Sequence, residues 1–295
     1  MRRMRRSRWS RHDLYLRETA RAFNGGVDLG TVSAVVEVRS RADLAALGPG
    51  VAVLAGGSVL FAEPHDHLTT LLDLTTLGWP AVTVDDRGLS LAATCPLVEI
   101  AALSATYADA WAAAPLFRQA CTALYGSFKI WNVATIGGNL CTSLPAGPMT
   151  SLAAGLDAEV LLWGADGTDR RLPAAAFVTG NTTNALRPGE VLRSVEFGPE
   201  ALASRTAYRK IALSAIGRSG VVLVGRRAPS GGFVLTVTAG TVRPVQLRYP
   251  APPPAATLHA DVEAVDAWFS DAHGAADWRR AVAVVLGLEI LEELA

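Results

Sequence analysis

Two glycine-rich turns, about 80 residues apart, constrain this chain more than any other feature of its sequence. The first spans residues 53–60, VLAGGSVL, and the second spans residues 132–140, NVATIGGNL. Because glycine has no Cβ, its backbone can adopt positive φ and its N–H groups can approach a ligand closely. Successive N–H groups in such turns form concavities that bind anions. The pair predicts a ligand with two phosphates, held from two sides.

These residues resemble the FAD-binding (medium) subunit of the molybdenum hydroxylases, the family of xanthine dehydrogenase and carbon monoxide dehydrogenase. That family carries both turns in this order, followed by a small-residue segment with a proline, which here is residues 140–147, LCTSLPAG. Residues 207–210, AYRK, resemble the start of the family's C-terminal domain, and residues 278–282, WRRAV, resemble its final helix. The resemblance covers roughly residues 25–295 and implies FAD as the cofactor.

Short apolar strands alternate with Ala/Leu-rich segments up to about residue 198, which predicts an α+β fold in two or three layers. Two hairpins are predicted around the polar turns at residues 85–88 and 164–167. The predicted elements are strands at 35–38, 51–54 and 70–74, hairpins at 82–93 and 159–172, helices at 41–47, 97–107, 115–124 and 152–156, and an exposed loop at 179–184.

The pattern changes near Gly198 and Pro199, where we place a domain boundary. Beyond it we predict antiparallel strands at 206–210, 220–226 and 233–239, a proline-rich surface connection at 244–254, and helices at 262–269 and 278–294. The resemblance names the first part a PCMH-type FAD-binding fold of two subdomains. The expected domains are a flexible arm at 1–24, the FAD-binding domain at 25–198 and a C-terminal domain at 199–295, with an antiparallel sheet and helices.

The first turn is expected to bind the diphosphate through backbone N–H groups and one hydroxyl, that of Ser58. A tight strand-to-helix turn without a ligand is the alternative, and the second turn at the family's spacing argues against it. The residues concerned are Ala55, Gly56, Gly57, Ser58, Val59 and Leu60.

The resemblance implies that the second turn lines the other side of the diphosphate and approaches the isoalloxazine ring. The family's use of these positions carries over because each of them matches its motif. The matching residues are Thr135, Ile136, Gly137, Gly138 and Asn139, flanked by Asn132 and Thr142.

Three further positions carry over from the family, each with an ordinary alternative. Tyr125 lies where relatives place an aromatic residue near the cofactor, Leu192 where one packs on the cofactor, and Lys210 where a charge tunes the flavin. Each could equally be a core side chain or a solvated strand lysine. Two departures stand out: Pro148 replaces an aspartate of many relatives, and Trp131 replaces an arginine.

Composition excludes several other classes of protein. The 27 basic and 27 acidic residues balance, whereas nonspecific nucleic-acid binding needs a basic surface. Cys95, Cys121 and Cys141 lie far apart, which supports neither a disulfide framework, a zinc site nor an iron–sulfur cluster, and fits the reducing cytoplasm. No apolar run is long enough to predict a membrane span. The stretch 63–67, EPHDH, is expected to be a solvated loop rather than a metal site.

The resemblance therefore implies an FAD-binding electron-transfer subunit, with no catalytic residue and no metal ligand of its own. A large molybdopterin subunit and a small subunit with two [2Fe-2S] clusters are the expected partners, in a dimer of heterotrimers. NAD, oxygen or a quinone would accept the electrons. A stand-alone FAD-dependent oxidoreductase of the same fold and a cofactor-free scaffold subunit are the alternatives.

Overall fold

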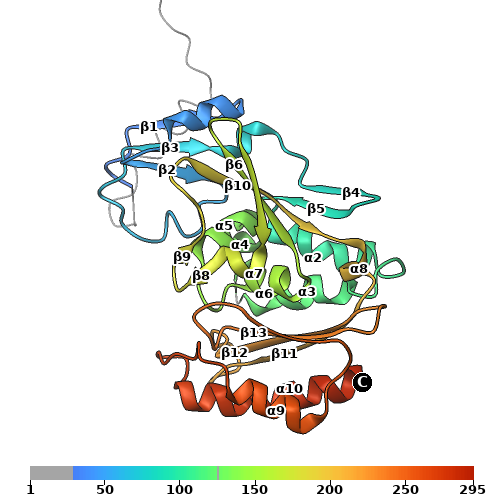
Figure 1. Ribbon diagram of the computed structural model, residues 1–295. Coiled ribbons are helices and arrows are strands. Elements are labelled where there is room, and N and C mark those ends of the chain that lie inside the picture. Colours follow the sequence, from blue (N-terminus) through green and yellow to red (C-terminus); the bar gives the residue numbers. More distant parts are fainter. Residues whose placement is uncertain (1–28, 125) are drawn as a thin grey trace, which may run out of the picture.

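The computed structural model describes residues 29–124 and 126–295, and its elements stack in layers (Figure 1). A small parallel sheet lies at one end, followed by an antiparallel sheet with a group of helices. A second antiparallel sheet packs against those helices, and the two C-terminal helices cover its far face (Figure 1). The predicted arm at 1–24 and Tyr125 lie outside the described residues.

The parallel sheet has three strands in the order β1-β3-β2. All three were predicted, and the helix predicted at 41–47 is a short 3-10 helix, which begins where the Asp43 carboxylate accepts the Ser40 N–H at 2.8 Å. The elements are β1 (Ala34–Glu37), η1 (Arg41–Ala46), β2 (Val51–Leu54), β3 (Thr70–Asp73) and η2 (Leu74–Leu77).

The larger sheet has five strands in the order β4-β5-β10-β6-β7, and every neighbouring pair is antiparallel. Both predicted hairpins are confirmed, but the central strand β10 (Glu190–Phe197) was not predicted. Its register against β6 shifts between Leu192 and Ser194, which leaves Arg193 as a bulge. The other strands are β4 (Val82–Asp85), β5 (Gly88–Ala92), β6 (Glu159–Gly164) and β7 (Asp169–Pro173).

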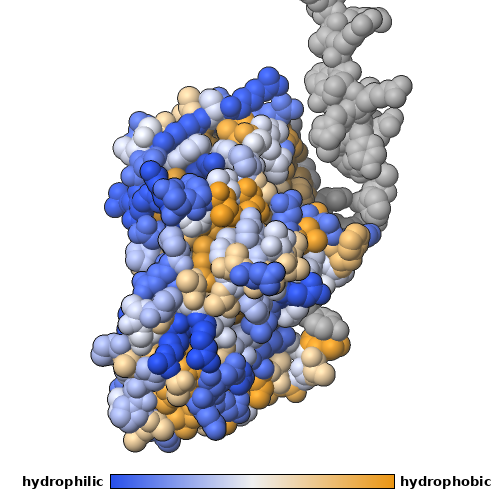
Figure 2. All heavy atoms as spheres, turned by 90° about the vertical axis from the view of Figure 1, so that its right-hand side faces the viewer, coloured by the Kyte–Doolittle hydropathy of each residue, from blue (hydrophilic) through white to orange (hydrophobic). Residues whose placement is uncertain are grey.

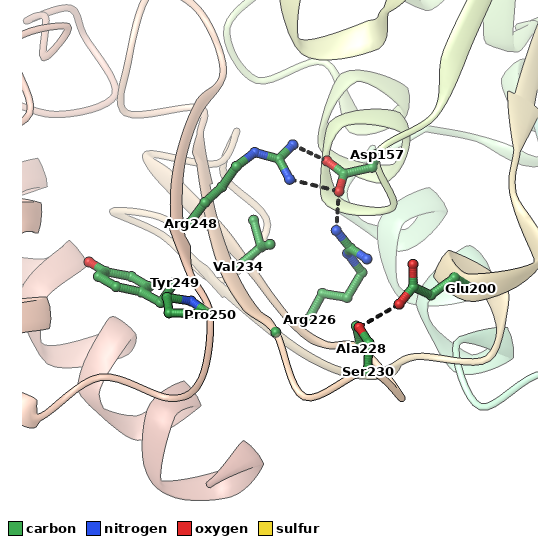
Figure 3. Close-up of a pocket in the computed structure, with 10 residues that line it drawn as sticks. Asp157, Glu200, Arg226, Ala228, Ser230, Val234, Arg248, Tyr249 and Pro250 are labelled. Atoms are coloured by element: carbon green, nitrogen blue, oxygen red, sulfur yellow. Dashed lines mark hydrogen bonds and ion pairs between the residues drawn. The ribbon is translucent and has the colours of Figure 1, made fainter.

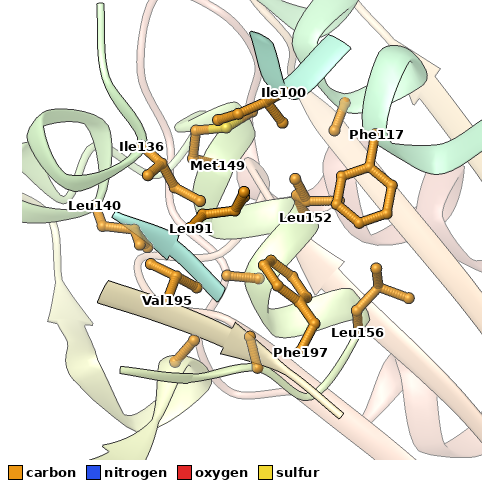
Figure 4. Close-up of a cluster of buried hydrophobic side chains, with 14 of the residues drawn as sticks. Leu91, Ile100, Phe117, Ile136, Leu140, Met149, Leu152, Leu156, Val195 and Phe197 are labelled. Atoms are coloured by element: carbon orange, nitrogen blue, oxygen red, sulfur yellow. The ribbon is translucent and has the colours of Figure 1, made fainter. Parts of the chain in front are cut away.

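Short helices pack on this sheet and enclose the main apolar core. Leu91 and Val195 come from the sheet, Phe117 from a helix, and Leu152 from the buried helix beneath them (Figure 4). The elements are α2 (Leu97–Thr106), α3 (Ala114–Ala123), α4 (Phe128–Val133), α5 (Ile136–Thr142), α6 (Pro148–Gly155), α7 (Ala174–Phe177), β8 (Val178–Gly180), β9 (Thr183–Asn184) and α8 (Pro199–Leu202). The loop predicted at 179–184 is thus a small hairpin.

The C-terminal sheet is antiparallel in the order β11-β12-β13-β14. Its last strand corrects the prediction of a surface connection at 244–254, and the helix predicted at 262–269 instead begins directly after Pro254. The elements are β11 (Arg205–Ile211), β12 (Val221–Arg227), β13 (Phe233–Thr238), β14 (Val245–Tyr249), α9 (Ala255–Glu263) and α10 (Ala276–Leu294).

An ion-pair cluster ties the C-terminal sheet to the end of α6. Arg226 of β12 and Arg248 of β14 both point toward Asp157, which follows α6 (Figure 3). Gln246 adds a hydrogen bond to the same carboxylate at 2.8 Å. Elsewhere, the surface shown in Figure 2 carries apolar patches scattered among hydrophilic residues. Within the described residues, no helix is both long and apolar enough to cross a membrane.

Candidate functional site

A cavity of about 640 Å³ lies between the parallel sheet and the helices that pack on the five-stranded sheet. Both glycine turns line it, although the first follows β2 of the parallel sheet and the second leads from α4 into α5. Its volume falls in the range of small-molecule and cofactor sites, roughly 300–1,000 Å³. The predicted residues that line it are Ala55, Gly56, Gly57, Ser58, Val59, Leu60, Thr135, Gly137, Gly138, Asn139, Thr142 and Leu192.

The two turns touch, and glycine is required where they do. A Cβ built on Gly56 would lie 1.6 Å from the carbonyl oxygen of Val133, which belongs to the second turn. Gly57 has a φ of +68°, and a Cβ there would lie 2.5 Å from the ring of Phe61. Any side chain at Gly56 would therefore separate the two turns, and one at Gly57 would strain the backbone.

The first turn presents free backbone donors to the cavity. The Phe61 N–H donates to the Gly57 carbonyl at 2.9 Å, so the chain enters a helical turn whose first N–H groups lack partners. Among the described residues, no acceptor is found for the N–H groups of residues 56–60. Several unpaired donors in one turn are an arrangement suited to an anionic group.

The second turn differs because its N–H groups already have partners within the chain. The Ile136 N–H donates to Cys95 at 3.0 Å, the Gly137 N–H to Ala93 at 2.9 Å and the Asn139 N–H to Thr135 at 3.0 Å. The Gly138 N–H donates to the Thr135 hydroxyl at 3.0 Å, which caps α5. This turn therefore lines the cavity with side chains and with glycine backbone atoms, and its N–H groups are not free to bind a ligand.

Three predicted residues that the structure describes lie outside the cavity lining. Ile136 points into the main core, where it is fully buried (Figure 4). Asn132 is exposed on α4, and its amide donates to the Phe128 carbonyl at 2.8 Å. Lys210 lies partly buried in β11. Their assignment to the cofactor stays a prediction.

Both departures from the family have structural roles. Pro148 is fully enclosed as the first residue of α6, where the N–H that proline lacks would have no helical partner. Trp131 lies on α4 and packs against the main core.

The lining is mainly apolar, and its titratable side chains are those of Glu63, His65, Cys141 and Glu190. Glu190 of β10 is paired with Arg170 at 2.5 Å, and this hydrogen bond holds the pKa of the Glu190 carboxyl below its ordinary value. Among the described lining residues there is no lysine or arginine. Burial raises the pKa of the Cys141 thiol to about 12, so the thiol stays neutral near pH 7. Backbone N–H groups are thus the main counterparts for an anion.

Several lining residues were not predicted because they arrive from distant parts of the chain. Thr182 belongs to the β8–β9 hairpin, which is held at α5 by a hydrogen bond from Asn184 to the Cys141 carbonyl at 2.8 Å. Glu63 and His65, in contrast, come from the loop directly after the first turn, the stretch that was expected to be a solvated loop. Across residues 29–124 and 126–295, no group of three or more His, Cys, Asp or Glu is placed to hold a metal ion.

A second, smaller cavity of about 390 Å³ lies beside the Asp157 cluster (Figure 3). Its charged groups pair with one another: Arg226 and Arg248 contact Asp157, and the Ser230 hydroxyl donates to Glu200 at 2.5 Å. No predicted site residue lines it. The first cavity is therefore the candidate ligand site.

The fold and the first cavity define a class of protein with a ligand cleft between two glycine turns. A family model described as the FAD binding domain in molybdopterin dehydrogenase matches residues 28–199, more than half of the chain. The chain belongs to this family, and FAD is its cofactor. The family and the cofactor predicted from the glycine turns are thereby confirmed. No curated protein matches the chain in sequence.

Solved structures share the fold over nearly the whole chain. Quinoline 2-oxidoreductase from Pseudomonas putida 86 matches with a TM-score of 0.75 and 19% identity, covering 90% of this chain and 98% of that one. The Cu,Mo-CO dehydrogenase in its cyanide-inactivated form matches with a TM-score of 0.76 and 21% identity, covering 89% of this chain and 98% of that one. Reconstituted CO dehydrogenase from Oligotropha carboxidovorans matches with a TM-score of 0.74 and 20% identity, covering 90% of this chain and 98% of that one. At these identities the likeness concerns the fold, and it confirms the predicted α+β flavoprotein architecture.

Proposed function

We propose that this chain is the FAD-binding electron-transfer subunit of a molybdenum-containing hydroxylase. It would take electrons from a small subunit with [2Fe-2S] clusters and pass them to NAD, oxygen or a quinone, while a large molybdopterin subunit oxidises the substrate. The observation that carries the proposal is the single cavity lined by both glycine turns. We further propose a dimer of heterotrimers in the cytoplasm, a reducing compartment that suits three free cysteines.

The residues present fit FAD at the first turn. The unpaired N–H groups of residues 56–60 and the hydroxyl of Ser58 would hold the diphosphate, and Gly56 allows the close contact with Val133 that brings the two turns together. Thr135, Asn139 and Leu192 would line the remainder of the cofactor. Bound FAD would supply the redox chemistry, whereas the protein binds the cofactor, orients it and sets its electrostatic surroundings.

Exposed apolar side chains near the cavity support a partner subunit at this face. Val59 and Phe61 of the first turn are 44% and 48% exposed, and Val133 and Phe128 of α4 are 43% and 82% exposed. The two segments meet where Gly56 contacts Val133. Exposed apolar groups that cluster are typical of protein interfaces, and we propose this one for the iron–sulfur subunit.

The first experiment is an absorption spectrum of the purified full-length chain, before and after heat release of any cofactor. Flavin bands with about one FAD per chain are the expected result, since one cavity contains both turns. A colourless chain that also fails to bind added FAD would contradict the proposal and favour a cofactor-free scaffold.

Pull-down from the native source separates the subunit from the stand-alone flavoenzyme. Co-purification of a molybdenum protein and an iron–sulfur protein is expected. Phe128→Ser, which changes a large apolar side chain that is 82% exposed, should weaken this co-purification without loss of FAD. An FAD-loaded monomer that reduces an acceptor with a small substrate and no partner would favour the stand-alone enzyme. Pro148 and Trp131, the residues that kept that alternative open, both have packing roles here.

A further inference from the structure

An arginine for which the described residues provide no ion pair lies against two tryptophans, next to a residue that lines the cavity. The Arg193 guanidinium carbon lies 4.3 Å from the ring centroid of Trp79 and 5.2 Å from that of Trp163. The two rings meet edge to face, with centroids 5.5 Å apart. Within residues 29–124 and 126–295, no hydrogen bond or ion pair is found for the Arg193 side chain. Burial lowers the pKa of this guanidinium, against the raising effect of Glu196.

The side chain of Arg193 reaches the part of the chain that holds the first glycine turn. Trp79 follows η2, which is joined to β3 of the parallel sheet, and Leu74 of η2 lines the cavity. Arg41 of η1 also lies near Trp163, 5.0 Å from the ring centroid. The cluster of Arg193, Trp79, Trp163 and Arg41 therefore joins the segments next to the parallel sheet to the five-stranded sheet, through attractive contacts between cations and aromatic rings.

The backbone of Arg193 reaches the second glycine turn. Its carbonyl accepts the N–H of Ala93 at 3.0 Å, and the Ala93 carbonyl accepts the N–H of Gly137 at 2.9 Å. Gly137 is pressed so closely on Ala93 that a Cβ there would lie 2.5 Å from the Ala93 side chain. A shift of Arg193 would thus be passed through Ala93 to the second turn.

We propose that Arg193 is a positioning residue that fixes the distance between the two glycine turns and thereby the affinity for FAD. Its side chain holds the wall that bears the first turn, and its backbone holds the wall that bears the second. Arg193 is the unpaired residue of the β-bulge and directly follows Leu192, which lines the cavity, so its side chain and its backbone contact different elements. The inference rests on the proposed function, since FAD is the ligand that spans the two turns.

The test is a fluorescence titration of FAD against the cofactor-free full chain, beside thermal unfolding of the same samples. Arg193→Gln should raise the dissociation constant of FAD about tenfold, and Arg193→Lys, which keeps the charge but loses the planar stack, about threefold. Trp79→Phe keeps an aromatic face and should fall between wild type and Arg193→Lys. The matched control is Arg39→Gln, because Arg39 is an exposed arginine just after β1 whose side chain pairs with Glu37 and contacts no aromatic ring among the described residues.

A second measurement separates positioning from stability alone. The visible circular dichroism of bound flavin should change in the Arg193 variants, because the ring would be held in a different orientation. Variants that melt earlier yet bind FAD as tightly as wild type, with the same dichroism, would overturn the inference and leave Arg193 a structural residue. If Arg193→Gln does not fold, the FAD affinity and the dichroism of Arg193→Lys and Trp79→Phe test the inference in its place. Wild type that fails to bind FAD would overturn the proposed function, and this inference with it.

Discussion

At the scale of single residues, Gly57 offers the sharpest test of the first turn. Its φ of +68° and the Phe61 ring beside it mean that Gly57→Ala strains the backbone and moves the turn. We expect a loss of about 1–2 kcal/mol of unfolding free energy and FAD binding about tenfold weaker. Urea unfolding and FAD titration measure the two effects.

The matched control for this change is Gly231→Ala. Gly231 has a φ of +99° and no atom within 4 Å of a built Cβ, and it lies in the turn between β12 and β13. It should lose a similar amount of stability and keep the FAD affinity of wild type. Equal FAD affinity in both variants would count against the first turn as the phosphate cradle.

The sequence predicted which residues would gather at the cavity better than how each would act. The glycines predicted that both turns would meet at one ligand, because glycine allows two backbone segments to approach closely. The contact of Gly56 with Val133 is such an approach. The direction of Ile136 could not be read, since the phase of α5 is set by Thr135 capping its first turn. Glu190 and Thr182 carry no local signal, because only the tertiary fold brings them to the cavity.

At the scale of elements, the cap of α5 links the stability of the second turn to one hydroxyl. Thr135→Val removes the acceptor of the Gly138 N–H while keeping the shape of the side chain, and should cost about 1 kcal/mol of unfolding free energy. Thr135→Ser keeps the acceptor and should restore most of it. Urea unfolding of the cofactor-free chain is the measurement.

Ser127 provides the comparison for Thr135. Its hydroxyl accepts the Ile130 N–H at 3.4 Å, a longer contact at the start of the exposed helix α4. Ser127→Ala should therefore cost only a few tenths of a kcal/mol. A larger loss in Ser127→Ala than in Thr135→Val would show that α5 is held by its buried packing and not by its cap.

The elements that the sequence did not predict share a physical cause, because each breaks a local rule. β10 shows no simple polar–apolar alternation, because Val191 and Leu192 are both buried but belong to two different cores, and the register shifts at Arg193. β14 was not predicted because it lies in a proline-rich stretch, which usually indicates a loop. Proline is tolerated here because β14 is at the edge of its sheet. Pro254 reads as part of a loop, although proline before the first turn of a helix favours that helix.

At the scale of the whole molecule, one carboxylate joins the C-terminal sheet to the helices beneath the cavity. Burial would raise the pKa of Asp157, but the hydrogen bond from Arg248 and the charges of Arg226 and Arg248 outweigh it and hold the pKa below its ordinary value. Arg226 is 6% exposed, so removal of its partner leaves a buried charge unpaired. We expect Asp157→Asn to lower the unfolding free energy by about 2 kcal/mol near pH 7.

The contribution of Asp157 to stability should depend on pH, because its pKa is lowered in the folded chain. A carboxyl whose pKa is lower in the folded chain stabilises the fold above its unfolded pKa, about 3.9, and loses that contribution as pH falls through the folded value. The gap in stability between wild type and Asp157→Asn should therefore be constant near neutrality and shrink below about pH 4. Urea unfolding across that range measures it. Asp169→Asn is the control, because Asp169 is 55% exposed in its pair with Arg41 and should cost under about 1 kcal/mol. A gap that stays constant into acid would mean that Asp157 acts through its shape and hydrogen bonds, not through its charge.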